Sequence, residues 1–202
     1  MAVTTTSSDY GFVTQMDVIL KEGNITVNSS AYGMFGKTTV CTFASEICKG
    51  DIVALSTDTA NTCSATGDHA VVAPIANGVD LAFGRVIDEP KWACDAQPTS
   101  SQSTWATMLS SGYYRIATIQ LLVPMVVLKA TLVCANAAAI VPGTAELIDI
   151  DASASQAAHG LSVVDVASGG SANMIPLTYV AQAASGSYSV LIGFKGFGTV
   201  TT

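Results

Sequence analysis

The chain has 202 residues, of which half are hydrophobic and only 11% are charged, and its formal net charge is −7. A chain of this length closes one core, or at most two small ones. Its lysines and arginines are spread singly, which excludes the clustered cations that nucleic acid or an anionic membrane surface requires. Because average soluble domains are about one quarter charged, we infer a neutral surface that costs little to desolvate against neighbouring molecules.

Residues 1–22 are predicted to form an extended N-terminal arm, followed by a single β domain over residues 23–202. The start of the arm is polar and rich in Thr and Ser, which is typical of a segment that orders only against a partner. The arm lacks the cationic start and the continuous apolar stretch of a signal peptide, so nothing in it marks the chain for export.

Apolar segments rich in Val, Ile and Thr are separated by Gly, Asn, Asp and Ser about every ten residues. This rhythm predicts an all-β fold of curled antiparallel sheets in a sandwich or partial barrel. The first hairpin is expected to start at Gly23 and to turn at residues 28–31. Asn77-Gly78 is a strong hairpin signal between two later strands. Further strands of the first half are predicted over residues 37–43, 52–56, 71–75 and 80–88.

The least β-like stretch, residues 89–111, is predicted to be a surface excursion with one helical turn over residues 105–109. It carries both tryptophans, Trp92 and Trp105, which can anchor it to its own domain or to a neighbouring molecule. Of these two anchors we favour the domain itself.

The second half continues the strand pattern over residues 113–120 and 125–130. The run 124–128 is continuously apolar, which predicts a strand covered on both faces. The apolar window 121–142 is long enough to raise the question of a bilayer span, but Lys129 near its middle favours two strands instead. The later strands are expected over residues 146–150, 162–166, 175–179 and 188–194.

An internal echo indicates a degenerate duplication, with units at about 50–120 and 143–194. Each unit has a strand led by Gly, then an Ala-x-Gly strand, then a closing strand led by Gly. Gly84 and Gly160 fall inside strand patterns, where Gly usually marks a bulge or a close approach of another chain segment. Each unit is therefore expected to be a curled sheet. The matched segments are 50–55 with 143–148, 81–88 with 157–165, and 112–117 with 186–192.

From Gly50 to Ala117 the order of motifs is Gly-Asp-x-Val-x-Leu, a polar loop, x-Ala-Phe-Gly-x-Val, a long excursion and Gly-x-x-x-Ile-Ala. This order resembles the small head-decoration, or cement, proteins of tailed bacteriophages, specifically the β-tulip type. The N-terminal arm and the Trp-bearing excursion depart from that family.

The resemblance implies a virion component on the outer capsid surface, made in the host cytoplasm. Such a component binds the lattice of the major capsid protein, commonly as a dimer or trimer, and stabilises it. The resemblance brings no catalytic residues and no cofactor.

No catalytic site is expected. His69 and His159 lie in separate halves without a nucleophile motif nearby, and a pairing of His69 with Cys63 is less favoured than a solvated loop histidine. The best metal candidate is the pair Asp149 and Asp151, which project from the same face of a predicted strand. Carboxylates on an exposed strand more often guard an edge against unwanted pairing, so this candidate needs further ligands.

The five cysteines are an odd number and do not describe a disulfide framework. No pair has the C-x-x-C spacing that places two thiolates around one metal ion. One bridge, between Cys41 and Cys48 on neighbouring strands, remains open.

The favoured hypothesis is a capsid-decorating protein without enzymatic activity, whose arm serves as a tether. The alternative is a self-assembling tube or filament subunit, in which the arm of one copy completes a sheet edge in the next. A third class, a carbohydrate-binding or hydrolytic β domain, needs aromatic platforms or paired acids such as Asp88-Glu89 in one cleft. The interface candidates are Tyr10, Phe12, Trp92 and Trp105.

Overall fold

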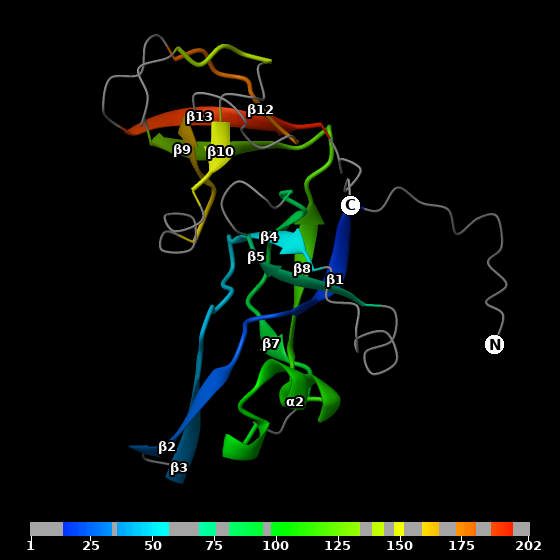
Figure 1. Cartoon of the computed structure of the whole chain (residues 1–202), viewed down its shortest axis with the longest axis vertical. Coiled ribbons are helices and arrows are strands. Elements are labelled where there is room, and N and C mark those ends of the chain that lie inside the picture. Colours follow the sequence, from blue (N-terminus) through cyan, green and yellow to red (C-terminus); the bar gives the residue numbers. More distant parts are fainter. Residues whose placement is uncertain are drawn as a thin grey trace, which may run out of the picture.

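The computed structural model describes residues 14–33, 36–56, 69–75, 81–94, 98–133, 139–143, 148–151, 159–165, 173–180 and 187–195. Strands predominate, which confirms the predicted all-β class (Figure 1). The elements are β1 (Gln15–Leu20), β2 (Ile25–Gly33), β3 (Gly36–Phe43), β4 (Ile52–Leu55), β5 (Ala70–Pro74), β6 (Gly84–Val86), β7 (Lys91–Trp92), η1 (Ser100–Gln102), α2 (Trp105–Ser110), β8 (Arg115–Leu121), β9 (Val127–Val133), β10 (Ile148–Ile150), β11 (Ser162–Asp165), β12 (Met174–Pro176) and β13 (Ser187–Phe194).

The first sheet closes on itself into a barrel. Its strand order is β1-β5-β4-β6-β8-β7, and β8 also pairs with β1. β1 is parallel to β5 and antiparallel to β8. At Gly84 of β6 a Cβ atom would lie 2.5 Å from Cδ1 of Ile119, so the close approach expected at this glycine is present. The apolar side chains inside the barrel are Val18, Leu20, Ile47, Val53, Val72, Val86, Ala117 and Ile119.

The second sheet, in the order β10-β11-β9-β13-β12, repeats the pairing scheme of the first. β9 is parallel to β11 and antiparallel to β13, as β1 is to β5 and β8. β10 pairs antiparallel with β11 and β12 with β13, as β4 does with β5 and β6 with β8. The edge strands β10 and β12 contact each other, so this sheet is curled and nearly closed.

The internal echo in the sequence matched three pairs of segments, and the strand topology agrees with two of these pairs. β4 corresponds to β10 and β8 corresponds to β13, as the Gly-led segments indicated. The middle match is offset by one strand, because residues 157–165 lead into β11, whose counterpart is β5 and not β6. The Ala-x-Gly motif therefore does not mark equivalent strands.

The barrel interior and the space between the barrel and the second sheet form two apolar cores, and β4 contributes to both. Val53 of β4 points into the barrel, while Ile52 and Ala54 pack with the apolar residues of the second sheet. The buried Nδ2 of Asn173 donates to the Ala82 carbonyl at 2.9 Å and adds a polar link between the two. β4 is apolar on both faces because both faces are covered.

The β2–β3 hairpin is longer than the sequence indicated. The expected turn at residues 28–31 is a β-bulge within β2, where the register against β3 shifts between Asn28 and Ala31. Small polar residues suit a bulge as well as a turn, which explains the error. The two strands form a separate ribbon that extends away from the barrel in Figure 1.

The boundary of the predicted arm is also wrong. Residues 15–20 of the predicted arm form β1, whose Val18, Ile19 and Leu20 are buried in the barrel. Residues 1–13, which contain Tyr10 and Phe12, lie outside the described residues. The strand had been missed because QMDVIL shows no alternation at its apolar end.

Of two other local predictions, a helical turn and a hairpin, the first is confirmed and the second is wrong. The helical turn expected at residues 105–109 is confirmed as α2, whose N-cap Thr104 accepts a hydrogen bond from the Thr107 N–H. The hairpin expected around Asn77-Gly78 is wrong, because β4 lies between β5 and β6. Asn77 and Gly78 themselves lie outside the described residues.

Within the described part of the chain, no helix has the length and apolar character needed to span a membrane.

Candidate docking surface

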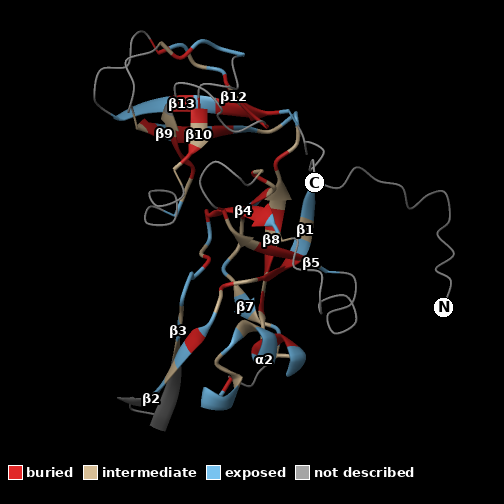
Figure 2. Cartoon of the chain, in the orientation of Figure 1, coloured by how far each residue is buried: buried red, intermediate tan, exposed pale blue. Residues whose placement is uncertain are grey.

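The outer face of the second sheet presents apolar side chains to solvent. β9 alternates strictly: Leu128, Ala130 and Leu132 are buried, and the residues between them are exposed. Val127 is 52% exposed and Leu191 of β13 is 47% exposed. The run after Pro124 is expected to be covered by its own core on one face and by something else on the other; the core covers one face of β9, and the second cover stays a prediction. Figure 2 shows exposed residues along part of β13.

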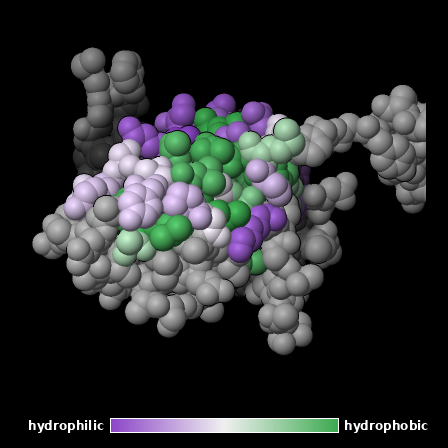
Figure 3. Space-filling view, turned by 90° about the horizontal axis from the view of Figure 1, so that it is seen from above, coloured by the Kyte–Doolittle hydropathy of each residue, from purple (hydrophilic) through white to green (hydrophobic). Residues whose placement is uncertain are grey.

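The apolar surface continues from β13 onto the segment that follows β12. The Leu177 N–H donates to the Leu191 carbonyl at 2.8 Å. The Leu177 side chain lies over Gly193, which is the register partner of Val127. We call Met125, Val127, Leu177, Tyr179 and Leu191 the apolar face; all are among the exposed large hydrophobic residues. Figure 3 looks onto this end of the molecule and shows hydrophobic atoms grouped together, with hydrophilic atoms beside them.

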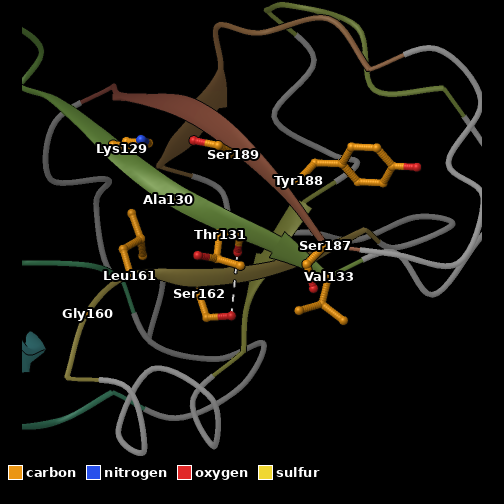
Figure 4. A pocket seen from close by; sticks show the side chains of 10 residues that line it. All are labelled: Lys129, Ala130, Thr131, Val133, Gly160, Leu161, Ser162, Ser187, Tyr188 and Ser189. Atoms are coloured by element: carbon orange, nitrogen blue, oxygen red, sulfur yellow. Dashed lines mark hydrogen bonds between the residues drawn. The ribbon is translucent and has the colours of Figure 1, made fainter.

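A shallow pocket of about 680 Å³ lies between β9, β11 and β13 (Figure 4). Hydroxyl groups dominate its polar lining, and the Ser162 Oγ donates to the Thr131 carbonyl at 3.5 Å. Among the described residues that line it there is no carboxylate, cysteine or histidine. Its hydroxyl groups and the ammonium group of Lys129 suit hydrogen bonding to polar groups of a ligand or of a neighbouring protein.

The two tryptophans lie at the other end of the molecule and contact their own chain. Trp92 packs on Phe43, with ring centroids 5.6 Å apart. The backbone N–H of Trp105 donates to Oδ1 of Asn24 at 3.2 Å. Both contacts attach the excursion to the β2–β3 region, and the Trp92 ring contact agrees with the intramolecular anchor that we favour. As interface candidates, Trp92 and Trp105 stay predictions.

The acidic candidates also have local partners. Asp88 accepts hydrogen bonds from the Thr118 N–H at 2.8 Å and from its Oγ1 at 3.0 Å. Asp149 Oδ1 accepts from the Ile150 N–H at 2.8 Å. In the described ranges, no third metal-ligating side chain accompanies Asp149 and Asp151. The metal site at this pair remains a prediction.

A buried charge network that the sequence did not reveal fixes the segment before β4. Glu22, 1% exposed, accepts from the Ile47 N–H at 2.7 Å and pairs with Arg115 at 3.2 Å. Arg115 also pairs with Glu46 at 3.2 Å and lies 4.8 Å from the Phe43 ring centroid. Burial raises the pKa of Glu22 to about 7, although Arg115 opposes the rise. These residues are far apart in sequence, so no local motif could indicate them.

The segment before β4 also contacts a histidine, at a position that the sequence did not indicate. His69 is exposed, and its suggested partner Cys63 lies outside the described residues. His159 instead contacts Asp51, beside Cys48. Burial raises the pKa of both the Cys48 thiol and the Asp51 carboxyl. Cys41 and Cys48 are free thiols, so the bridge left open between them is absent in the structure.

No protein-family model, curated protein or solved structure matches this chain.

Proposed function

We propose that this protein is a capsid decoration protein, which binds the outer lattice of a virus capsid through the apolar face and stabilises it. The observation that carries the proposal is the apolar face, in which Val127 and Leu191 are about half exposed on paired strands of the second sheet. The resemblance of residues 50–117 to β-tulip cement proteins supplies the class of partner.

The chemistry of the apolar face suits contact with protein. Interface centres are depleted of charge and rich in large apolar and aromatic side chains. Lys129 is the charged residue on the β9 part of this face, and Ser189 and Thr131 beside it are hydroxyl residues. Such a surface loses little hydration free energy when it docks on a neutral partner.

The β2–β3 ribbon supports the alternative of a tube or filament subunit. In the described structure the ribbon pairs with no third strand. The Ile25 N–H at its base donates to the Ser103 carbonyl at 2.8 Å, so the ribbon edges beyond Ile25 can accept a strand from another copy. Under both hypotheses the chain binds copies of itself. A decoration protein would form a dimer or a trimer, and a tube or filament subunit would form a polymer.

The first experiment is mass spectrometry of intact, purified virus particles from the source of the chain. A decoration protein is expected as a stoichiometric component of the particle. Its absence from the particles would rule out the proposal. Negative-stain microscopy of the purified chain addresses the alternative, because long polymers without any partner favour the filament subunit.

A pair of variants tests the apolar face itself. Leu191→Asp is expected to weaken binding to stripped particles about tenfold or more, since a charge is buried at the centre of the contact. Leu55→Asp is the matched control, because Leu55 is 50% exposed but lies on β4, outside the apolar face. Equal binding by both variants would show that another surface docks.

A further inference from the structure

Three potential metal ligands from distant parts of the chain converge between the barrel and the second sheet. The ligand atoms of Cys48, Asp51 and His159 all lie within 4.8 Å of one another. Cys48 and Asp51 precede β4, whereas His159 precedes β11. In the described residues this is the one such group of three.

The distance between His159 and Asp51 already matches that between two ligands of a metal ion. Nδ1 of His159 lies 3.1 Å from Oδ1 of Asp51. Two such ligands, each about 2.0 Å from a tetrahedral zinc ion, lie about 3.3 Å apart. The Cys48 sulfur needs to approach by at most about 1 Å to complete the set. The Cys48 N–H donates to Oδ2 of Asp51 at 2.8 Å and orients that carboxylate, as outer-shell hydrogen bonds do in metal sites.

The backbones of the two segments lie close together at Gly50 and His159. Gly50 has φ +100°, and a Cβ atom there would lie 2.5 Å from the His159 carbonyl oxygen. His159 itself has φ 48°, a left-handed conformation that a non-glycine residue adopts only when its surroundings require it. The Gly50 N–H donates to the Val86 carbonyl at 2.9 Å, which fixes this loop to β6. The two segments that carry the ligands are therefore already neighbours in the folded chain.

The three side chains form a group that solvent can reach from one side. The Asp51 side chain is 7% exposed, whereas that of His159 is 47% exposed. An ion can therefore reach the group past the imidazole, and a water molecule can fill a fourth position. A sulfur, nitrogen and oxygen donor set suits zinc and similar transition ions, and it does not suit calcium or magnesium, which select oxygen.

We propose that Cys48, Asp51 and His159 bind a divalent transition ion of the zinc class, which clips the loop before β4 to the turn before β11. The ion joins the barrel to the second sheet at a point where each contributes ligands. The simpler explanation of the geometry is an Asp51–His159 ion pair beside an uninvolved thiol, and the experiments below separate the two.

The first experiment uses the reduced wild-type chain and zinc or cobalt(II). One zinc ion per chain is expected in equilibrium dialysis, and cobalt(II) is expected to show a thiolate-to-metal charge-transfer band with tetrahedral visible bands. Zinc is also expected to protect Cys48 from alkylation, mapped by peptide mass spectrometry, and to leave Cys41 and Cys94 as reactive as before. Absence of binding, or zinc binding without protection of Cys48, would overturn the proposal.

Two ligand variants and one control complete the test. Cys48→Ser and His159→Asn are expected to weaken zinc binding by more than the roughly 10- to 100-fold that loss of an outer-shell partner causes. Asn tolerates the left-handed conformation of position 159, so this variant is expected to keep the backbone. Cys41→Ser, at another free and half-buried thiol, is the matched control and should bind like the wild type. Cys48→Ser with wild-type affinity would overturn the proposal.

Discussion

The barrel and the second sheet follow the same strand-pairing scheme, but they differ in what covers their outer faces. β4 of the barrel is buried on both faces, by the barrel interior at Val53 and by the second sheet at Ile52. β9 of the second sheet is buried on one face, and Val127 on the other face is half exposed. A continuous apolar run therefore does not by itself tell whether both faces of a strand are covered. The neighbour that covers it decides, and for β9 we propose that the neighbour is another protein.

The barrel also differs from the second sheet in its buried charge network, which gives the largest expected effect. Above pH 7, where Glu22 is ionised, Arg115→Met should lower the free energy of unfolding by up to about 3 to 5 kcal/mol, because it leaves this buried carboxylate without its cation. Urea unfolding measures this loss. Arg85→Met, at an exposed arginine of β6, is the control and should change stability by less than about 0.5 kcal/mol. The double variant Glu22→Gln with Arg115→Met should regain part of the loss, and no recovery would contradict the charge explanation.

Matched cavities test whether the two regions unfold together. Leu20→Ala in the barrel and Leu132→Ala in the second sheet each remove a fully buried side chain, and each should cost about 2 to 5 kcal/mol. Because β4 contributes residues to both cores, both variants should retain a single unfolding transition by calorimetry. Two separate transitions in either variant would show that the regions are independent.

The pH dependence of stability is a further test of the buried charge network, which lies in the barrel and not in the second sheet. Burial raises the pKa of Glu22 from 4.5 to about 7, so the folded chain holds this proton in a range where the unfolded chain has released it. Stability is therefore highest below pH 4.5 as far as Glu22 is concerned, and it falls as pH rises to about 7, by at most about 3 kcal/mol. Denaturation at a series of pH values should show this decline, and Glu22→Gln should remove it. Parallel curves for the two proteins would contradict the assignment.

The smallest effect on stability is expected from truncation of the N-terminus. Deletion of residues 1–12 leaves β1 intact, so the free energy of unfolding should change by less than about 0.5 kcal/mol. Under the tether hypothesis the same deletion weakens docking on the capsid lattice, and unchanged docking would remove that hypothesis. Deletion of residues 1–20 is the contrasting variant, because it removes β1 from the closed barrel and should prevent stable folding.

The sequence by itself determined the all-β class, most of the strands and the single helical turn of the excursion. These features depend on local patterns: runs of β-branched residues in the strands, and the N-cap at Thr104 in the helix. It also indicated the close approach at Gly84, because a glycine inside a strand has few other uses.

Only the tertiary structure decided the pairing of the strands and the residues that meet between them. Local signals placed a turn where β2 bulges and a hairpin where β4 intervenes, since both outcomes suit the same residues. Glu22 meets Arg115, and Asp51 meets His159, across separations of about a hundred residues that no spacing rule connects. The physical reason is that side chains far apart in the chain become neighbours only when a barrel closes and a second sheet covers it.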